Sequence, residues 1–320
     1  MFKFIFRSAM TGIPAPLSFT LPDLCVLQFQ GADAVSFLHA QVSNDLEHLA
    51  ADRACIAAYC TAKGRSLATM VLWREQNETV FALVRRDLSE ALIKRLRMFV
   101  LRSKVTISLS ELLVYGVADQ SPTQAVWTLH RDGTDTLIQA PGELDSLSRH
   151  WRIAAQQDAS VQASEGRWES ADILAGLPWI GAATQDLFIP QTLNLDLIDG
   201  INFKKGCYPG QEVVARSHYR GTIKRRMMTA RTAVLDTAPQ VQEGSDVFLR
   251  SSTDASAELV AAARIINLAW QTEQQRCYVL MEVVLADLEQ GQFQLEQGQA
   301  LELLPLPYAL PELSSSDDTN

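Results

Sequence analysis

The sequence predicts an α+β protein built from more than one lobe and ending in a small β-barrel. A chain of 320 residues is longer than one ordinary hydrophobic core supports, so two or three domains are expected. Up to residue 118, strand-like and helix-like runs follow the order βα-βββ-αβ, which favours helices on one face of an antiparallel sheet. From Lys224 onward, short β-type runs separated by turns indicate a small barrel.

The first lobe is expected at residues 21–118, after an N-terminal arm at residues 1–20. Apolar residues at helical spacing predict helices at Ala32–Gln41 and Leu88–Leu101, and Asp87 is a suitable N-cap for the second. Runs rich in apolar and β-branched residues predict the strands Leu24–Phe29, Ala54–Tyr59, Ser66–Trp73, Val80–Arg85, Val105–Ser108 and Leu112–Val117.

A second α+β lobe is expected at residues 119–223. A helix is predicted at Ser164–Ala175, with Ser164 as its cap and Gly176 as its stop signal. Upstream of this helix the chain is polar and irregular. Only two short strands are expected there, Trp127–Leu129 and Thr136–Gln139.

The barrel is expected at residues 224–310. A polar and acidic tail at residues 311–320 follows it and is expected to be disordered. The strands predicted for the barrel are Met227–Val234, Asp246–Leu249, Glu258–Leu268, Cys277–Val284 and Ala300–Leu304.

Charge is distributed unevenly along the chain. The content of 47% apolar and 20% charged residues is that of a soluble globular protein. The formal net charge of −9 argues against a general nucleic-acid coat or a membrane-surface protein. The segment Lys204–Arg231 nevertheless holds eight Lys or Arg and one acidic residue. Such a segment favours a local anionic ligand, and a solvated cationic face is the alternative.

Cysteine and histidine spacing predicts no metal site. The five cysteines form no C-x-x-C pair, and the histidines have no helical metal-ligand spacing. An odd number of cysteines without a secretory leader fits a reducing cytoplasm. No run approaches the roughly 20 apolar residues that span a bilayer, so no membrane partner is expected.

One stretch, Lys204–Arg216, concentrates chemically specific residues. Cys207 follows two lysines, and nearby cations favour the thiolate form of a cysteine. Gly206 and Gly210 flank it, and glycine lets a backbone turn tightly or approach a ligand closely. The pattern predicts a reactive thiol in a tight loop, and the alternative is a turn with a buried structural cysteine.

The same stretch resembles the signature of the YgfZ family, Lys-Gly-Cys-Tyr-x-Gly-Gln-Glu, which falls at Lys205–Glu212. That family is related to the folate-dependent T-protein of glycine cleavage. The similarity extends in both directions and covers about residues 20–310. The further segments that carry it are Gly31–Asp33, Phe37–Asp45, Thr61–Arg65, Phe188–Gln191, Gly200–Phe203 and Leu304–Tyr308.

The resemblance implies a T-protein-like assembly of α+β lobes and a C-terminal β-barrel, with a pocket or channel at their junction. It implies a folate-binding accessory protein that supports iron–sulfur enzymes, including enzymes that modify tRNA. Tetrahydrofolate or a related folate is the implied cofactor, and an iron–sulfur cluster would be bound only transiently. Cys207 would be the reactive centre and Lys205 its electrostatic partner. The remaining motif residues would order the loop, namely Gly206, Tyr208, Gly210, Gln211, Glu212 and Arg216.

Two positions bear on folate binding. The resemblance assigns Trp168 to the folate site, whereas composition alone favours a core residue there. The family's second folate-associated tryptophan would fall at Leu24, which is not aromatic in this chain. That difference puts the shape of the pocket or its affinity for folate in question.

Two other functions are alternatives. A folate-dependent one-carbon (aminomethyl) transferase is the first, but Ala68 and Thr69 stand where the T-protein has a carboxylate pair. Neither side chain transfers a proton as a carboxylate does, so that activity is not expected. An RNA-binding module is the second, and the net charge of −9 without interleaved aromatics weighs against direct nucleic-acid binding.

The expected partners are therefore a folate with a polyglutamate tail and iron–sulfur client enzymes. Lys63 and Arg65 of the first hairpin are candidates to contact such a tail or a phosphate, and a solvated turn explains them equally well. The basic segment is expected to attract the tail through Lys204, Lys205, Arg216, Arg220, Lys224, Arg225 and Arg226.

Overall fold

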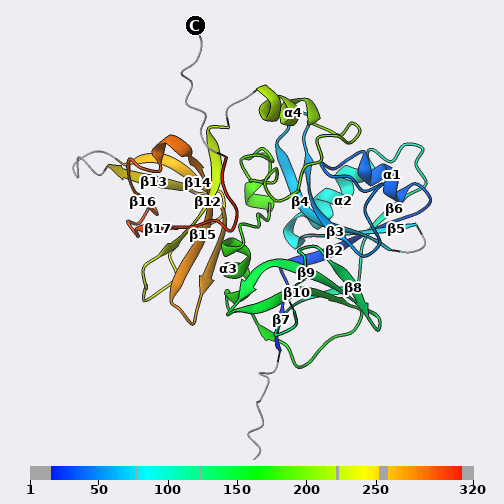
Figure 1. Cartoon of the computed structure of the whole chain (residues 1–320), viewed down its shortest axis with the longest axis horizontal. Helices are drawn as coiled ribbons and strands as arrows, with labels where there is room; N and C mark the ends of the chain where they lie inside the picture. Colours follow the sequence, from blue (N-terminus) through cyan, green and yellow to red (C-terminus); the bar gives the residue numbers. More distant parts are fainter. Residues whose placement is uncertain (1–15, 76–77, 123, 221–222, 252–258, 312–320) are drawn as a thin grey trace, which may run out of the picture.

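The computed structural model describes residues 16–75, 78–122, 124–220, 223–251 and 259–311. Within these ranges the chain forms three β-sheets (Figure 1). The two N-terminal sheets lie together on one side of the view, and the C-terminal sheet lies on the other side. A central segment, residues 175–210, has little regular structure and runs between them.

The first sheet has five antiparallel strands in the order β3-β4-β5-β2-β6. Helix α1 (Ala34–His39) follows β2, and a short 3-10 turn, η1 (Arg86–Leu88), leads from β5 into α2 (Ser89–Arg97). The strand bounds are β2 Leu24–Gln30, β3 Ala54–Cys60, β4 Ser66–Glu75, β5 Thr79–Arg85 and β6 Thr106–Leu109.

The predicted apolar stripe of α2 is only partly buried. Leu92 and Leu96 are buried against the sheet, as expected. The helix ends at Arg97, earlier than predicted, so Phe99 lies beyond it and is exposed. Phe99 therefore does not belong to the core of the first lobe, whereas Val100 is partly buried against it.

The second sheet has six strands in the order β11-β1-β7-β10-β9-β8. Strand β1 (Leu17–Thr20) pairs with β7 (Leu113–Asp119), although the sequence placed these segments in the arm and in the first lobe. Sheet membership therefore crosses the expected boundaries at residues 20 and 118, and the domain division stays a prediction. The other strands are β8 Leu129–Asp132, β9 Asp135–Leu144, β10 Leu147–Ala154 and β11 Gln162–Ala163.

The polar region before α3 is more regular than expected. Strands β9 and β10 form a hairpin, and β10 was not predicted. Its Arg149 is fully buried because its guanidinium pairs with Asp172 of α3. A buried charge with a distant partner has the same appearance in the sequence as a solvated one, which explains the error.

Both predicted N-caps are wrong. Asp87 lies inside η1, and its carboxylate accepts a hydrogen bond from the Ala182 N–H at 3.0 Å, which ties α2 to the central segment. Ser164 precedes α3 (Arg167–Leu174) by three residues, and its hydroxyl accepts a hydrogen bond from the Gly166 N–H. Asp87 thus bonds to a distant segment and Ser164 holds the turn before α3, so neither side chain caps its helix.

Helix α3 joins the second sheet to the C-terminal sheet (Figure 1). At its start, a Cβ built on Gly166 would lie 1.9 Å from the carbonyl oxygen of Trp270. At its end, a Cβ built on Gly142 would lie 2.8 Å from the Ala175 Cβ. Gly176 has φ +61° and ends the helix, as predicted.

The C-terminal sheet closes into the predicted barrel. Its antiparallel order is β16-β13-β14-β15-β12-β17. A β-bridge between Gln294 and Ala300 brings the two edge strands together. The bounds are β12 Arg225–Thr232, β13 Asp246–Ser251, β14 Val260–Gln271, β15 Arg276–Val284, β16 Gly291–Gln294 and β17 Leu301–Leu304. Strand β16 was not expected, and most of the predicted tail lies outside the described residues.

The central segment is bonded to different parts of the molecule. The Ser43 hydroxyl donates to the Gly200 carbonyl at 2.7 Å, in the first lobe. The Asn194 side-chain amide donates to the Met227 carbonyl of β12 at 2.9 Å, in the barrel. Because this segment leads directly into Lys204–Arg216, its contacts fix where the motif lies relative to the lobes.

Candidate functional site

The motif forms a tight loop that ends in helix α4 (Gln211–Arg220). The Asn202 side-chain oxygen accepts hydrogen bonds from the backbone N–H groups of Lys204 and Lys205, at 2.9 and 3.1 Å. The Asn202 N–H itself donates to the Ser43 carbonyl. These bonds turn the chain at the start of the motif and attach it to the first lobe.

Gly210 packs against the tip of the first hairpin. It has φ +82°, and a Cβ built there would lie 2.4 Å from the Thr61 carbonyl oxygen and 2.6 Å from the Gly64 Cα. Gly64 in turn has φ +71°, and its own Cβ would lie 2.9 Å from the Val213 Cβ. Only glycine fits this close approach of two backbones, so the pair sets the position of α4.

Lys205 is directed into the protein. Its ammonium donates hydrogen bonds to the carbonyls of His39 at 2.6 Å and Val42 at 2.9 Å, just after α1. It also lies 4.9 Å from the centre of the Tyr208 ring. Burial lowers the pKa of this ammonium to about 8. Lys205 thus anchors the loop to α1, in addition to placing a positive charge near Cys207.

Cys207 is the exposed cysteine of the chain. Cys25, Cys60 and Cys277 are buried, and Cys55 is half-buried. Burial raises the pKa of the Cys60 and Cys277 thiols to about 12, so they are poor nucleophiles. The predicted role of Cys207 as the reactive thiol stays a prediction, and its exposure is consistent with it.

His39 is a site residue that the sequence analysis did not assign. Its Nε2 lies 3.9 Å from a Cβ built on Gly206, directly before Cys207. Its Nδ1 accepts a hydrogen bond from the Leu46 N–H at 3.3 Å, which favours the neutral ring with its proton on Nε2, and the Asp45 carboxylate lies 3.4 Å from the same Nδ1. Burial and the Lys205 charge lower the pKa of this histidine, which keeps it neutral at neutral pH. Its only sequence signal was its place in the segment Phe37–Asp45.

The remaining motif residues lie in α4 or beside it. Tyr208 is buried, while Glu212 and Arg216 are exposed. Glu212 and Arg216 are spaced i,i+4 on α4, but no ion pair among the described residues joins them. The Gln191 amide donates to the Val214 carbonyl at 2.5 Å and holds α4 from the central segment. The loop is therefore ordered mainly by side-chain hydrogen bonds to backbone groups, from Asn202, Lys205 and Gln191, and by the close approach of Gly210 to the hairpin.

Two of the cations expected to attract a tail have structural roles. Arg226 is buried and forms two hydrogen bonds with the Asp196 carboxylate, at 2.6 and 3.0 Å. Lys205 is buried as described above. The expectation that the whole basic segment forms one surface is wrong for these two, because their positive charges are used inside the protein. The side chain of Arg220 lies outside the described part of the structure.

A cavity of about 400 Å³ lies where the lobes, the central segment and the C-terminal end meet. Trp127 lines it and has φ +70°, a conformation that costs energy for a bulky residue. The Trp127 ring is stacked on Trp151 at a centroid distance of 6.0 Å. The polar groups at the cavity are Arg53, Asp199 and Tyr308, and its apolar lining includes Val126, Leu177, Ile198 and Pro307.

Trp168 is buried behind this cavity. Its ring lies against Gly116, with the Arg149 guanidinium 4.3 Å from its centre. It contacts Trp151 edge-on at 6.4 Å, so Trp151 connects it to Trp127. The Trp168 Nε1 is buried and has no partner among the described residues. Its predicted contact with folate stays a prediction.

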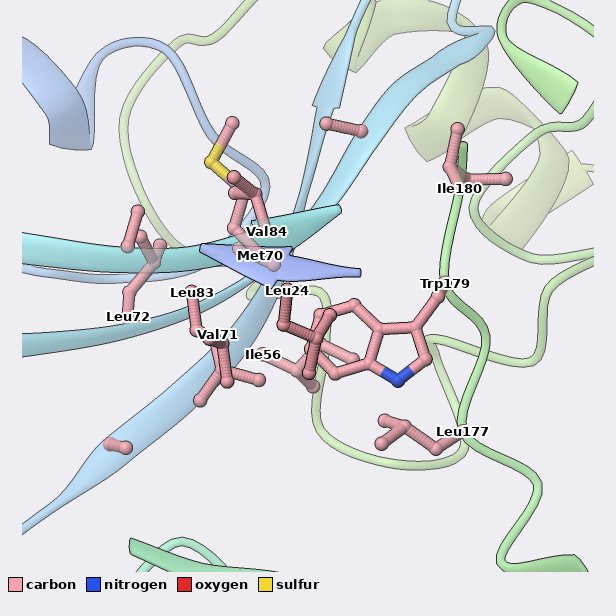
Figure 2. Close-up of a cluster of buried hydrophobic side chains, with 14 of the residues drawn as sticks. Leu24, Ile56, Met70, Val71, Leu72, Leu83, Val84, Leu177, Trp179 and Ile180 are labelled. Atoms are coloured by element: carbon pink, nitrogen blue, oxygen red, sulfur yellow. The ribbon is translucent and has the colours of Figure 1, made fainter. Parts of the chain in front are cut away.

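Leu24 packs within a cluster that includes an aromatic residue from elsewhere in the chain. Figure 2 shows Leu24 of β2 beside the Trp179 ring of the central segment, both among buried side chains. The Trp179 Nε1 donates to the Asp172 carboxylate at 2.9 Å. An indole therefore lies next to Leu24 although the sequence has no aromatic residue at that position.

The two positions at which the T-protein has carboxylates carry buried residues without an acid group in this chain. Ala68 is buried, and the Thr69 hydroxyl donates to the Pro178 carbonyl at 2.8 Å. The same hydroxyl accepts a hydrogen bond from the Ile180 N–H at 3.0 Å. The Thr69 hydroxyl thus donates its only proton to the central segment and has none left for a ligand.

A second hollow, of about 730 Å³, lies between the first hairpin and the barrel. Lys63 and Arg65 line it, as do Arg225 and Arg264. Arg264 pairs with Asp246 at 2.8 Å and Arg225 lies 3.5 Å from Glu282, so part of the positive charge is neutralised. Contact of this hollow with a polyglutamate tail stays a prediction.

No group of three or more His, Cys, Asp or Glu side chains within the described ranges is arranged to hold a metal ion. In the same ranges no helix combines the length and the apolar character that crossing a membrane requires.

Comparison with known proteins places these observations in context. No protein-family model matches the chain. A protein of Serratia proteamaculans named tRNA-modifying protein YgfZ is 30% identical over 95% of this chain and 96% of its own length. An uncharacterized protein of Haemophilus influenzae is 30% identical over 90% of this chain and 96% of its own length. The glycine cleavage system aminomethyltransferase T of Bartonella henselae superposes with a TM-score of 0.68 at 13% identity, over 91% of this chain and 86% of that one.

The α+β lobes, the C-terminal barrel and the superposition define a protein of T-protein-like fold, as the sequence resemblance implied. Within that fold, the chain belongs to the YgfZ family. The structural likeness at 13% identity establishes the fold alone, so activity must be argued from the site.

Proposed function

We propose that this chain is a folate-binding protein that supports tRNA modification by iron–sulfur enzymes. Its relative from Serratia proteamaculans carries a name that refers to tRNA modification, and its fold is that of a folate-dependent protein. The observation that carries the folate part is the junction cavity beside Trp127. The exposed Cys207 carries the part that concerns client enzymes.

The cavity has the size and lining that suit a planar heterocycle. Mostly apolar walls with a few convergent polar groups are typical of small-molecule sites. The Trp127 indole offers an aromatic face, and Arg53 and Asp199 can hydrogen-bond the polar edge of a pterin ring. Trp168 does not line this cavity, because Trp151 lies between its ring and Trp127. When bound, a reduced folate supplies a carrier for one-carbon units.

The chain's own residues bind and orient the ring and exclude water from it. Trp127 contacts the ring, and Trp151 and Trp168 support Trp127 from behind. Aminomethyl transfer is not part of the proposal, because Thr69 is saturated and Ala68 has no polar group. Cys207 is the group that meets a client protein, since the loop presents its thiol to solvent.

Fluorescence titration with tetrahydrofolate under reducing conditions tests the cavity. Removing a stacked aromatic costs about 1–3 kcal/mol, by analogy with base stacking, so Trp127→Ala is expected to weaken binding roughly five- to a hundredfold. Trp168→Phe keeps the aromatic packing behind Trp127 and removes an N–H that does not line the cavity, so it is expected to leave binding nearly unchanged. Equal affinity of wild type and Trp127→Ala would refute the assignment of the ring to this cavity.

Complementation of a deletion strain, with iron–sulfur enzyme activities and tRNA modification as readouts, tests the function. Cys207→Ser is expected to fail, whereas Cys55→Ser, which changes a half-buried thiol, is expected to complement. Complementation by Cys207→Ser would show that the thiol is dispensable and that the motif is structural.

A further inference from the structure

A second basic segment, Lys94–Lys104, lies at the end of α2 and the turn that follows it. It contains five Lys or Arg and no acidic residue. We call it the α2 patch. Its cations are Lys94, Arg95, Arg97, Arg102 and Lys104, and its exposed apolar residues are Met98, Phe99 and Leu101.

The apolar part of the patch is unusually open to solvent. Met98 is 62% exposed, Phe99 is 44% exposed and Leu101 is 86% exposed. Leu109 on the neighbouring strand β6 is 45% exposed. These four large apolar side chains are exposed close together, three of them consecutive or nearly so in the chain and one on the adjoining strand. Grouped exposed apolar residues mark a binding surface more often than isolated ones do.

Four of the patch cations are exposed, namely Lys94, Arg97, Arg102 and Lys104, whereas Arg95 is half-buried and hydrogen-bonds to the Tyr59 side chain. In the described part of the chain none of the five forms an ion pair with a carboxylate. Asp33 is the acid beside the patch, and its carboxylate accepts a hydrogen bond from the Lys104 backbone N–H at 2.6 Å. Arg97 is held in place, because its Nε and Nη2 donate to the Ile107 carbonyl at 3.2 and 2.5 Å.

A ligand that fits this patch must combine negative charges with flat apolar groups. Cations stand on both sides of an apolar run at residues 98–101, in the order Lys-Arg-Leu-Arg-Met-Phe-Val-Leu-Arg-Ser-Lys. In a single-stranded nucleic acid every nucleotide carries one phosphate charge and one base with a π-face. On a folded acidic protein, apolar side chains are mostly withdrawn into the core. We propose that the α2 patch binds single-stranded RNA, with Phe99 stacking on a base and the cations contacting phosphates.

The patch lies close to the motif through α1. The start of α1 contacts the patch, since Asp33 bonds to Lys104, and its end contacts the motif, since the His39 carbonyl accepts from Lys205. A helix of this length spans about 9 Å. The patch and the motif loop thus contact opposite ends of the same short helix.

This inference goes beyond the proposed function, which requires no direct contact with RNA, and it revises the expectation that direct nucleic-acid binding is absent. The net charge of −9 describes the whole chain, whereas the phosphates nearest the protein meet the local charge of the patch. Five cations also limit the strength of binding. The logarithm of affinity should fall by at most about 3.5 per tenfold rise in salt, for five contacts to a single strand.

Fluorescence anisotropy with a labelled 20-nucleotide oligouridine, and with an unmodified tRNA transcript that has single-stranded loops, is the test. The charge variant is Lys94→Gln/Arg102→Gln/Lys104→Gln. The matched control is Lys204→Gln/Arg216→Gln/Lys224→Gln, which changes the net charge equally and alters exposed cations of the other basic segment. The charge variant is expected to lower the salt slope by about 2, and the control is expected to leave it nearly unchanged.

Phe99→Ala is expected to weaken oligouridine binding roughly five- to a hundredfold, and Phe99→Trp is expected to restore it. Thermal unfolding should show all these exposed-site variants to be folded. Absence of wild-type binding at 50 mM salt, or equal losses in the two triple variants, would overturn the proposal. Equal affinity for poly-glutamate and oligouridine would overturn it in favour of an acidic protein partner. Complementation by Cys207→Ser would contradict the proposed function only. Failure of the RNA-binding assay would contradict the inference on the α2 patch only, so the two failures are distinguishable.

Discussion

The two basic segments of this protein differ in where their positive charge is directed. Lys204–Arg231 has the larger excess of cations, but Lys205 and Arg226 are buried and bond to carbonyls and to a carboxylate inside the protein. The α2 patch has fewer cations, and none of them has an ion-pair partner within the described ranges. Local charge density in a sequence is therefore a poor guide to which cations attract a ligand.

The difference has a physical cause. A cation is buried only where carbonyls or carboxylates compensate its desolvation, and those partners come from distant parts of the chain. The Lys205 ammonium bonds to the His39 and Val42 carbonyls at the end of α1. The Arg226 guanidinium bonds to the Asp196 carboxylate of the central segment. At the end of α2 no carboxylate of the described residues pairs with the cations, and Lys94, Arg102 and Lys104 remain in solvent. Variants of the buried cations should affect stability, and those of the patch should affect binding.

The largest effect is expected for Arg226→Ala. It leaves the Asp196 carboxylate buried without a partner, which typically costs about 3–5 kcal/mol. Urea denaturation of wild type and variant measures the change. Arg226→Met/Asp196→Leu removes both charges and is expected to recover much of the loss. The exposed pair Arg231–Glu302 is the control, and Arg231→Ala should change stability little. Equal losses at both pairs would contradict the distinction drawn here.

Lys205→Met is expected to show a loss that depends on pH. The folded pKa of Lys205 is about 8, below its ordinary 10.5, so the unfolded chain holds the proton more tightly. Charging Lys205 therefore weakens the folded state below pH 8, and stability recovers as pH rises from about 8 to 10.5. The free-energy difference between wild type and Lys205→Met should grow by up to about 3 kcal/mol over that window. A difference independent of pH would mean that the ammonium is not desolvated in the fold.

A smaller effect, of about 1–3 kcal/mol, is expected for Gly210→Ala, because φ is +82° and the new Cβ would meet the hairpin backbone. Gly206→Ala is the matched control, since the nearest atom to its Cβ is the His39 Nε2 at an ordinary 3.9 Å. Thermal unfolding of the two variants measures the contrast. If Gly206→Ala were the more damaging, the hairpin contact would not be what positions α4.

Several features could be predicted from neighbouring residues alone. The α+β class, the C-terminal barrel and the stop of α3 at Gly176 follow from hydrophobic periodicity and turn residues, which act over a few positions. The motif around Cys207 was found because its residues are adjacent in the chain. The family resemblance extended this to the whole T-protein-like fold.

Other features depended on contacts between distant segments. Leu17–Thr20 pairs with residues 115–118, and such long-range pairing leaves no local pattern in the chain. The same holds for His39 beside Gly206, for Trp127 at the junction cavity and for Trp179 beside Leu24. The sequence determined the fold class, the type of most elements and the place of the motif, because these depend on local propensity and adjacency. The tertiary structure decided which cations and aromatic rings are buried and which are available to a ligand, because burial depends on partners that the chain brings together only when it folds.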